Sequence, residues 1–239
     1  MSQKNGSERR LTQRFGLSSP LLYGKVMLGN TLQCPLRDLS YGGFSVHLTT
    51  PEMAHESVLL PKTTPLEIHL LGAKMPGEAS LVFANKERLG YSFCHESAAM
   101  LVFLRRFLEY MRLGSQATLL DRKFVKEQYQ GLEWNCFRGE GPVDVMLKHN
   151  GTSGALDEAL VTFREKEEYR SLSYRESKVL THKSIDISGV ATRMAPTSGI
   201  DPDLARKAVC LLIGILQEKN SATKPVEALL EKIMAHLTD

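Results

Sequence analysis

The stretch Asp38-Leu39-Ser40-Tyr41-Gly42-Gly43 separates two runs of residues, Leu32–Leu39 and Phe44–Leu48, in which apolar and polar side chains alternate. Alternation with a period of two is typical of β-strands that bury one face. Serine and paired glycines between such runs are typical of a tight turn, because glycine adopts backbone conformations that other residues avoid. The stretch therefore predicts two antiparallel strands joined by a short turn.

Similar short runs lie on both sides of this hairpin, and turn residues separate them at Gly29-Asn30, from Pro61 to Pro65, and at Pro76-Gly77. Many short strands with close turn signals predict an antiparallel barrel or sandwich over residues 20–113. The further predicted strands are Leu22–Leu28, Leu66–Leu70, Leu81–Ala84 and Gly90–Phe93.

A helix is expected directly after these strands. The segment from Ala98 to Arg112 contains no glycine or proline, Ser97 precedes it as a candidate N-cap, and Gly114 lies just beyond it. Apolar side chains recur along it at helical spacing, which predicts a face that covers the barrel. These residues are Leu101, Leu104, Leu108 and Met111.

The second half of the chain has a different pattern. Residues 114–117 form the candidate linker, and residues 118–239 then carry alternating runs around Trp134, Val145, Leu160 and Leu172. Asp201-Pro202 is a typical helix start, and a last amphipathic segment covers about Pro225–Leu237. This half is predicted to be an α+β domain with a small antiparallel sheet and two terminal helices.

The composition restricts the class of protein. The chain has 239 residues with 42% hydrophobic and 24% charged residues, which are ordinary values for a globular protein. Four widely spaced cysteines, no long apolar run and no secretory leader predict a cytoplasmic location without membrane insertion. The net charge of +3 lies entirely in residues 1–14, so the rest of the chain is formally neutral and binding to a nucleic-acid polymer is not expected.

The basic segment contains Arg10-Leu-Thr-Gln-Arg14, an RxxxR pattern directly before the first predicted strand. Separately, RxxxR is typical of a solvated terminus and Asp38 with Gly42-Gly43 is typical of a turn. In this order and spacing, RxxxR followed by the Asp38, Ser40 and Gly43 pattern DxSxxG resembles the PilZ family of bacterial cyclic di-GMP receptors. Leu89–Phe93 resembles the strand that closes such domains. The resemblance covers about residues 8–112 and implies a barrel with a C-terminal covering helix.

The residue types suit this ligand. The guanidinium fork of arginine matches the paired acceptors O6 and N7 of guanine, stacks on a purine and pairs with phosphate. The Asp38 carboxylate can accept from the other edge of guanine, the Ser40 hydroxyl can reach phosphate or base, and Gly43 permits close approach of the backbone. The candidate ligand residues are Arg9, Arg10, Arg14, Asp38, Ser40, Gly42 and Gly43.

These observations lead to one functional hypothesis and one alternative. In the first, cyclic di-GMP orders a flexible basic arm, residues 1–19, and thereby changes the arrangement or the protein partner of residues 118–239. In the alternative, the barrel is a scaffold without ligand, and the chain is a protein-interaction module. No catalytic or metal-binding pattern is evident, so we expect neither an enzyme nor a cofactor.

Overall fold

The structure is a computed structural model in which the chain divides into two compact units, residues 1–108 and 109–239. The structure describes residues 13–17, 24–29, 31–50, 52–53, 60–94, 97–140, 143–150, 152–165, 168–187, 191–196, 199–217 and 221–237.

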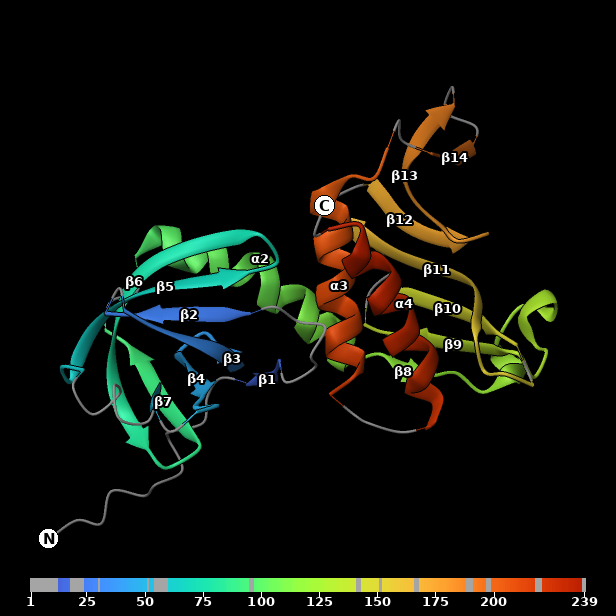
Figure 1. The fold of residues 1–239 in the computed structure, drawn as a ribbon. Coiled ribbons are helices and arrows are strands. Elements are labelled where there is room, and N and C mark those ends of the chain that lie inside the picture. Colours follow the sequence, from blue (N-terminus) through green and yellow to red (C-terminus); the bar gives the residue numbers. More distant parts are fainter. Residues whose placement is uncertain are drawn as a thin grey trace, which may run out of the picture. The chain divides into compact units, whose positions relative to one another are not determined.

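The first unit contains a closed antiparallel barrel of six strands, which confirms the barrel prediction (Figure 1). The strands follow one another in the order β3-β2-β5-β6-β7-β4, and the pairing of β3 with β4 closes the barrel. A short additional strand, β1, pairs with β3. The strand bounds are β1 Phe15–Gly16, β2 Lys25–Leu28, β3 Leu32–Ser40, β4 Gly43–His47, β5 Thr63–Leu70, β6 Ala73–Ala84 and β7 Arg88–Phe93.

One predicted turn in this unit is wrong. Pro76-Gly77 lies within β6, opposite Leu66 and Glu67 of β5, and the hairpin turns instead at Leu71-Gly72, where both residues have positive φ. Gly77 leaves room inside the strand for a side chain of the helix that follows the barrel strands. A Cβ at Gly77 would lie 3.2 Å from the Cε atom of Met100.

That helix is α2, Ala98–Ser115, and the Ser97 hydroxyl caps it by accepting from the backbone N–H of Met100 at 3.1 Å. Its buried residues include Met100, Leu104 and Phe107, whereas Leu101, predicted to face the core, is exposed. The helix also continues beyond its predicted end, so Gly114, predicted to lie after the helix, belongs to its last turn.

The second unit is built on an open antiparallel sheet of seven strands in the order β14-β13-β12-β11-β10-β9-β8. Its sheet is therefore larger than the small sheet predicted. The bounds are β8 Thr118–Leu119, β9 Trp134–Arg138, β10 Asp144–His149, β11 Leu156–Glu165, β12 Glu168–Arg175, β13 Lys178–Ile187 and β14 Ala191–Pro196. The short 3₁₀ turns Arg122–Phe124 and Glu127–Tyr129 lie between β8 and β9, and a third, Ser221–Thr223, precedes the last helix.

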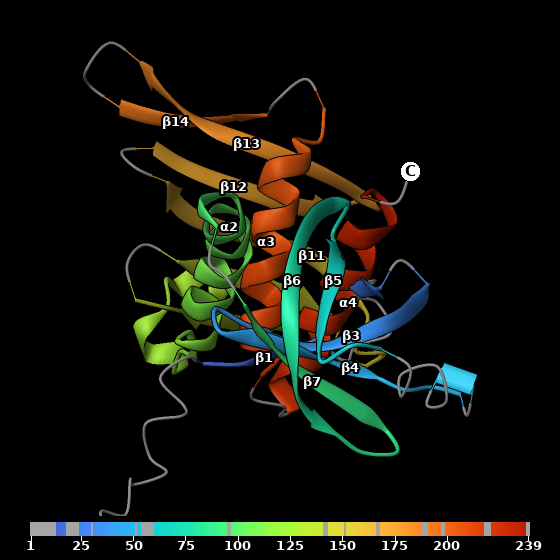
Figure 2. The same cartoon turned by 90° about the vertical axis from the view of Figure 1, so that its left-hand side faces the viewer.

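Two helices, α3 Pro202–Ile215 and α4 Lys224–Ala235, cover one face of this sheet (Figures 1 and 2). The predicted cap of α3 is present, because the Asp201 carboxylate accepts from the backbone N–H groups of Asp203 and Leu204. The core beneath the helices is apolar and includes Val145, Val161, Phe163, Leu172, Val209, Leu212, Leu229 and Ile233.

The end of α2 belongs to this second core. A Cβ at Gly114 would lie 1.9 Å from the carbonyl oxygen of Leu211, and a Cβ at Gly214 would lie 2.1 Å from that of Met111. The Tyr110 ring meets the Phe163 ring edge-on at 5.3 Å between centroids. The two glycines therefore allow the backbones of α2 and α3 to touch.

Candidate ligand-binding site on the barrel

Arg14 is held beside the barrel by the residues that follow it. Phe15 and Gly16 pair with Leu39 and Asp38 of β3, and the Leu17 N–H donates to the Arg37 carbonyl at 2.6 Å. The side chains of Phe15 and Leu17 are buried. Residues 13–17, part of the predicted flexible arm, are thus fixed to β3, and this places Arg14 next to Asp38.

The two charged residues of the motif form an ion pair. Arg14 Nη1 donates to Asp38 Oδ1 at 3.0 Å, with 55% of the arginine side chain and 16% of the aspartate side chain exposed. The other carboxylate oxygen, Oδ2, accepts from the Ser45 hydroxyl at 2.5 Å. Asp38 is therefore oriented from two sides, and Arg14 keeps further N–H groups that can face solvent or a ligand.

Ser40 and Gly43 build the turn. The Ser40 hydroxyl is buried and donates to the Gly43 carbonyl at 2.9 Å. Gly43 lies opposite Ser92 of β7, and a Cβ there would come within 2.1 Å of the Tyr91 carbonyl oxygen. In the structure, Ser40 and Gly43 stabilise the turn and its pairing with β7. Among the described motif residues, the exposed charge is that of the ion pair between Arg14 and Asp38.

Gly42 joins the turn to β7. Its carbonyl accepts from the Phe93 N–H at 3.2 Å and from the Ser92 hydroxyl at 3.3 Å. The other two predicted ligand residues, Arg9 and Arg10, lie outside the described residues. The structure adds Ser45, which the motif does not include. Its place opposite Asp38 follows from the regular pairing that begins at the turn, in which Ser40 pairs with Gly43 and Leu39 with Phe44.

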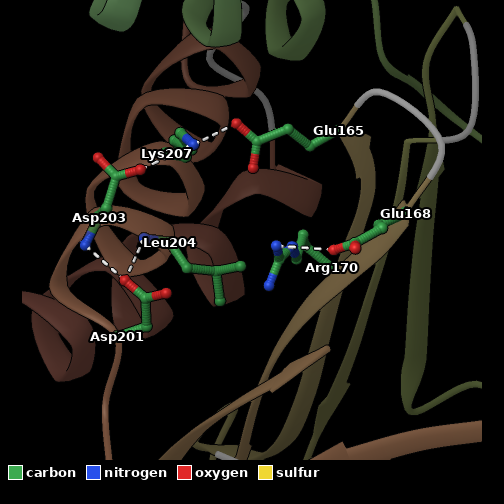
Figure 3. Close-up of a pocket in the computed structure, with 7 residues that line it drawn as sticks. All are labelled: Glu165, Glu168, Arg170, Asp201, Asp203, Leu204 and Lys207. Atoms are coloured by element: carbon green, nitrogen blue, oxygen red, sulfur yellow. Dashed lines mark hydrogen bonds and ion pairs between the residues drawn. The ribbon is translucent and has the colours of Figure 1, made fainter. Parts of the chain in front are cut away.

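The second unit contains a cavity of about 500 Å³ between the start of α3 and the adjoining ends of β11 and β12 (Figure 3). Four carboxylates and two cations line it together with Leu204. The charged residues are Glu165, Glu168, Asp201, Asp203, Arg170 and Lys207.

One ion pair in this cavity connects α3 to the sheet, and two others lie within α3 and within β12. Lys207 of α3 donates to Glu165 of β11 at 2.5 Å and to Asp203 at 2.8 Å, and Arg170 pairs with Glu168 at 2.7 Å. Burial acts to lower the pKa of Lys207, but the hydrogen bonds to Asp203 and Glu165 outweigh it and the pKa is raised. Two of the pairs are local in sequence, but the contact between Lys207 and Glu165 joins residues 42 positions apart, which no local motif could have revealed.

No family model, curated protein or solved structure matches this chain. Within the described part of the chain, no helix is long and apolar enough to cross a membrane. Among the same residues, no three His, Cys, Asp or Glu side chains are grouped as metal ligands would be. The candidate site therefore rests on the geometry around Arg14 and Asp38.

Proposed function

We propose that the barrel binds cyclic di-GMP and that the protein is a bacterial receptor for this second messenger. The observation that carries the proposal is the pairing of Arg14 with Asp38, because it places an exposed guanidinium beside an oriented carboxylate on the barrel surface. Both groups belong to the pattern by which the chain resembles the PilZ family.

The chemistry of the pair fits a guanine nucleotide. Arginine carries five N–H donors in a planar fork, and among the described residues Arg14 uses its fork for Asp38. The remaining donors can reach the acceptors of a guanine or the oxygens of a phosphodiester. Asp38 then acts as a positioning residue for Arg14, and it retains lone pairs that can accept from the base.

In the proposed mechanism, Arg9 and Arg10 contact the same ligand from the N-terminal side. Fixing this segment costs conformational entropy, which the charge-assisted contacts must exceed for binding to occur. The ordered segment then alters the arrangement or the partner binding of the C-terminal part of the chain.

Isothermal titration calorimetry with cyclic di-GMP tests the proposal. We expect the intact chain to bind, Arg14→Ala to weaken binding at least about tenfold, and the double variant Arg10→Ala/Arg14→Ala to show no measurable binding. Arg105→Ala is the matched control, because it removes an exposed arginine on α2 and should leave the affinity unchanged.

Equal affinities for the intact chain, Arg14→Ala and Arg105→Ala would exclude this site. No binding of cyclic di-GMP to the intact chain would overturn the receptor proposal and favour the ligand-independent interaction module.

A further inference from the structure

A row of paired residues runs across the outer wall of the barrel, starting from the candidate site. Asp38 of β3 pairs with Ser45 of β4, Ser45 pairs with Gly90 of β7, and Gly90 pairs with Phe83 of β6. Residues paired in this way have their side chains on the same face of the sheet. With neighbouring strands about 4.8 Å apart, the row extends about 14 Å from the carboxylate to the aromatic ring.

The far end of the row exposes apolar side chains where a regular strand would not. The register of β6 shifts between Leu81 and Phe83, and this bulge leaves Val82 68% exposed and Phe83 41% exposed. Bulges redirect side chains and are common next to binding sites. The Phe83 side chain lies over Gly90, since a Cβ at Gly90 would be in van der Waals contact with the Cβ atom of Phe83 at 3.5 Å.

A cation accompanies the exposed ring. The Arg88 guanidinium carbon lies 4.8 Å from the centroid of the Phe83 ring. Among the described residues, no carboxylate lies within ion-pair distance of Arg88, so its charge is not neutralised as that of Arg14 is. A nucleobase can stack on a phenyl ring that has a guanidinium beside it. The positive charge of the guanidinium also attracts a phosphate group.

We infer that Phe83 and Arg88 form a second contact region, which receives one base of a purine dinucleotide whose other half is held at Arg14 and Asp38. The inference rests on the proposed function and extends it, because it assigns residues outside the motif to the ligand. The row has an oriented carboxylate at one end and a stacking surface at the other, and the two residues between them, Ser45 and Gly90, are small and buried. A single nucleotide would occupy only one end of the row.

The test is the affinity of the full chain for cyclic di-GMP, measured by calorimetry, with variants of the two residues. We expect Phe83→Ala to weaken binding about 5- to 150-fold, which is the range for loss of one base–aromatic contact. Phe83→Leu keeps an apolar side chain but no ring, so it should also lose affinity, whereas Phe83→Trp should retain or increase it.

Two further variants show whether a loss of affinity comes from lost stacking, from lost positive charge or from damage to the fold. Arg88→Lys keeps the charge but loses the planar group, and it should bind less tightly than the intact chain. Val82→Ala alters the neighbouring exposed side chain in the same bulge and should bind normally. Thermal unfolding of each variant identifies any that fail to fold, in which case Phe83→Trp and Arg88→Lys still decide the question.

The outcomes distinguish the inference from the proposed function. Normal binding by Phe83→Ala, Phe83→Leu and Arg88→Lys, together with weakened binding by Arg14→Ala, would overturn the second contact region and leave the receptor proposal standing. No binding of cyclic di-GMP to the intact chain would overturn both. Weakened binding by the Phe83 and Arg88 variants, with normal binding by Val82→Ala, supports the inference.

Discussion

Gly43 shows how strongly one residue of the motif depends on its neighbours. A methyl group at this position would meet the carbonyl oxygen of Tyr91 at 2.1 Å, and both backbones belong to paired strands that cannot separate freely. We therefore expect Gly43→Ala to lower the free energy of unfolding by about 1–3 kcal/mol, the usual cost of overpacking. Urea denaturation of the intact chain and the variant measures the difference.

Gly199→Ala is the matched control for this substitution. Apart from its chain neighbours, no atom of the described residues lies within 4 Å of the position its Cβ would take, so its effect should stay within about 0.5 kcal/mol. If Gly43→Ala were as stable as the intact chain, the close approach of β4 and β7 described above would be wrong.

At this scale, the sequence located Asp38 and Arg14 but could not separate residues that contact a ligand from residues that shape the turn. The distinction depends on Tyr91, which lies far along the chain from Gly43 and reaches it only through strand pairing. Ser45 was missed because the motif does not include it, although the regular pairing of the hairpin places it opposite Asp38.

At the scale of elements, the close crossing of α2 and α3 predicts that replacing a glycine at the crossing with alanine lowers the stability of the protein. In most helices the same substitution raises it. Replacing a helix-interior glycine with alanine ordinarily stabilises the helix by about 1 kcal/mol. At Gly114 the new methyl group would lie 1.9 Å from the Leu211 carbonyl oxygen, so Gly114→Ala should instead destabilise the protein by about 1–3 kcal/mol. Thermal and urea unfolding of the variant measure the sign directly.

Gly214→Ala should act in the same direction, because its Cβ would meet the Met111 carbonyl oxygen at 2.1 Å. A variant of either glycine that unfolds at a higher urea concentration than the intact chain would contradict the described crossing.

The same crossing explains why the end of α2 could not be predicted. Glycine after an amphipathic run commonly marks the residue beyond a helix, and Gly114 fits that pattern. Its actual role depends on contact with α3, which no local pattern records. The turn predicted at Pro76-Gly77 was wrong for a similar reason, because Gly77 lies inside a strand and leaves room there for the Met100 side chain. In contrast, the cap residues Ser97 and Asp201 were predictable because capping is local.

At the scale of the whole molecule, buried titratable groups in the two units predict losses of stability at opposite ends of the pH range. Burial raises the pKa of Tyr91 in the barrel to about 12, so the unfolded chain releases this proton first and stability falls as the pH rises from about 10 to 12. Burial lowers the pKa of His182 in the sheet, so the unfolded chain takes up this proton first and stability falls as the pH drops below about 6.5.

Urea unfolding of the intact chain, Tyr91→Phe and His182→Gln across this pH range measures both effects. Tyr91→Phe should flatten the alkaline fall only, and His182→Gln should flatten the acidic fall only. A pH profile unchanged by either substitution would show that the group does not titrate differently in the folded and unfolded chains.

The barrel could be predicted from the sequence at this scale because four of its five connections are only two or three residues long, and the connection from β4 to β5 is the exception. The sheet of the second unit was underestimated, since β8 has only two residues and β14 lacks a clear alternation of apolar and polar residues. β8 and β14 are each paired with a longer neighbour, β9 and β13, and this pairing establishes them as strands.

The contact between Gly114 and Gly214 also has a consequence for the order in which the chain is made. During synthesis, the last turn of α2 leaves the ribosome about a hundred residues before the part of α3 on which it rests. At about 5–20 residues per second, that interval lasts about 5–20 s. The barrel strands are complete by then, whereas Tyr110, Met111 and Gly114 have no core to join. A nascent chain at this stage would thus have a complete barrel followed by the end of α2, whose apolar side chains are still exposed. We expect a chaperone to bind the chain at this stage.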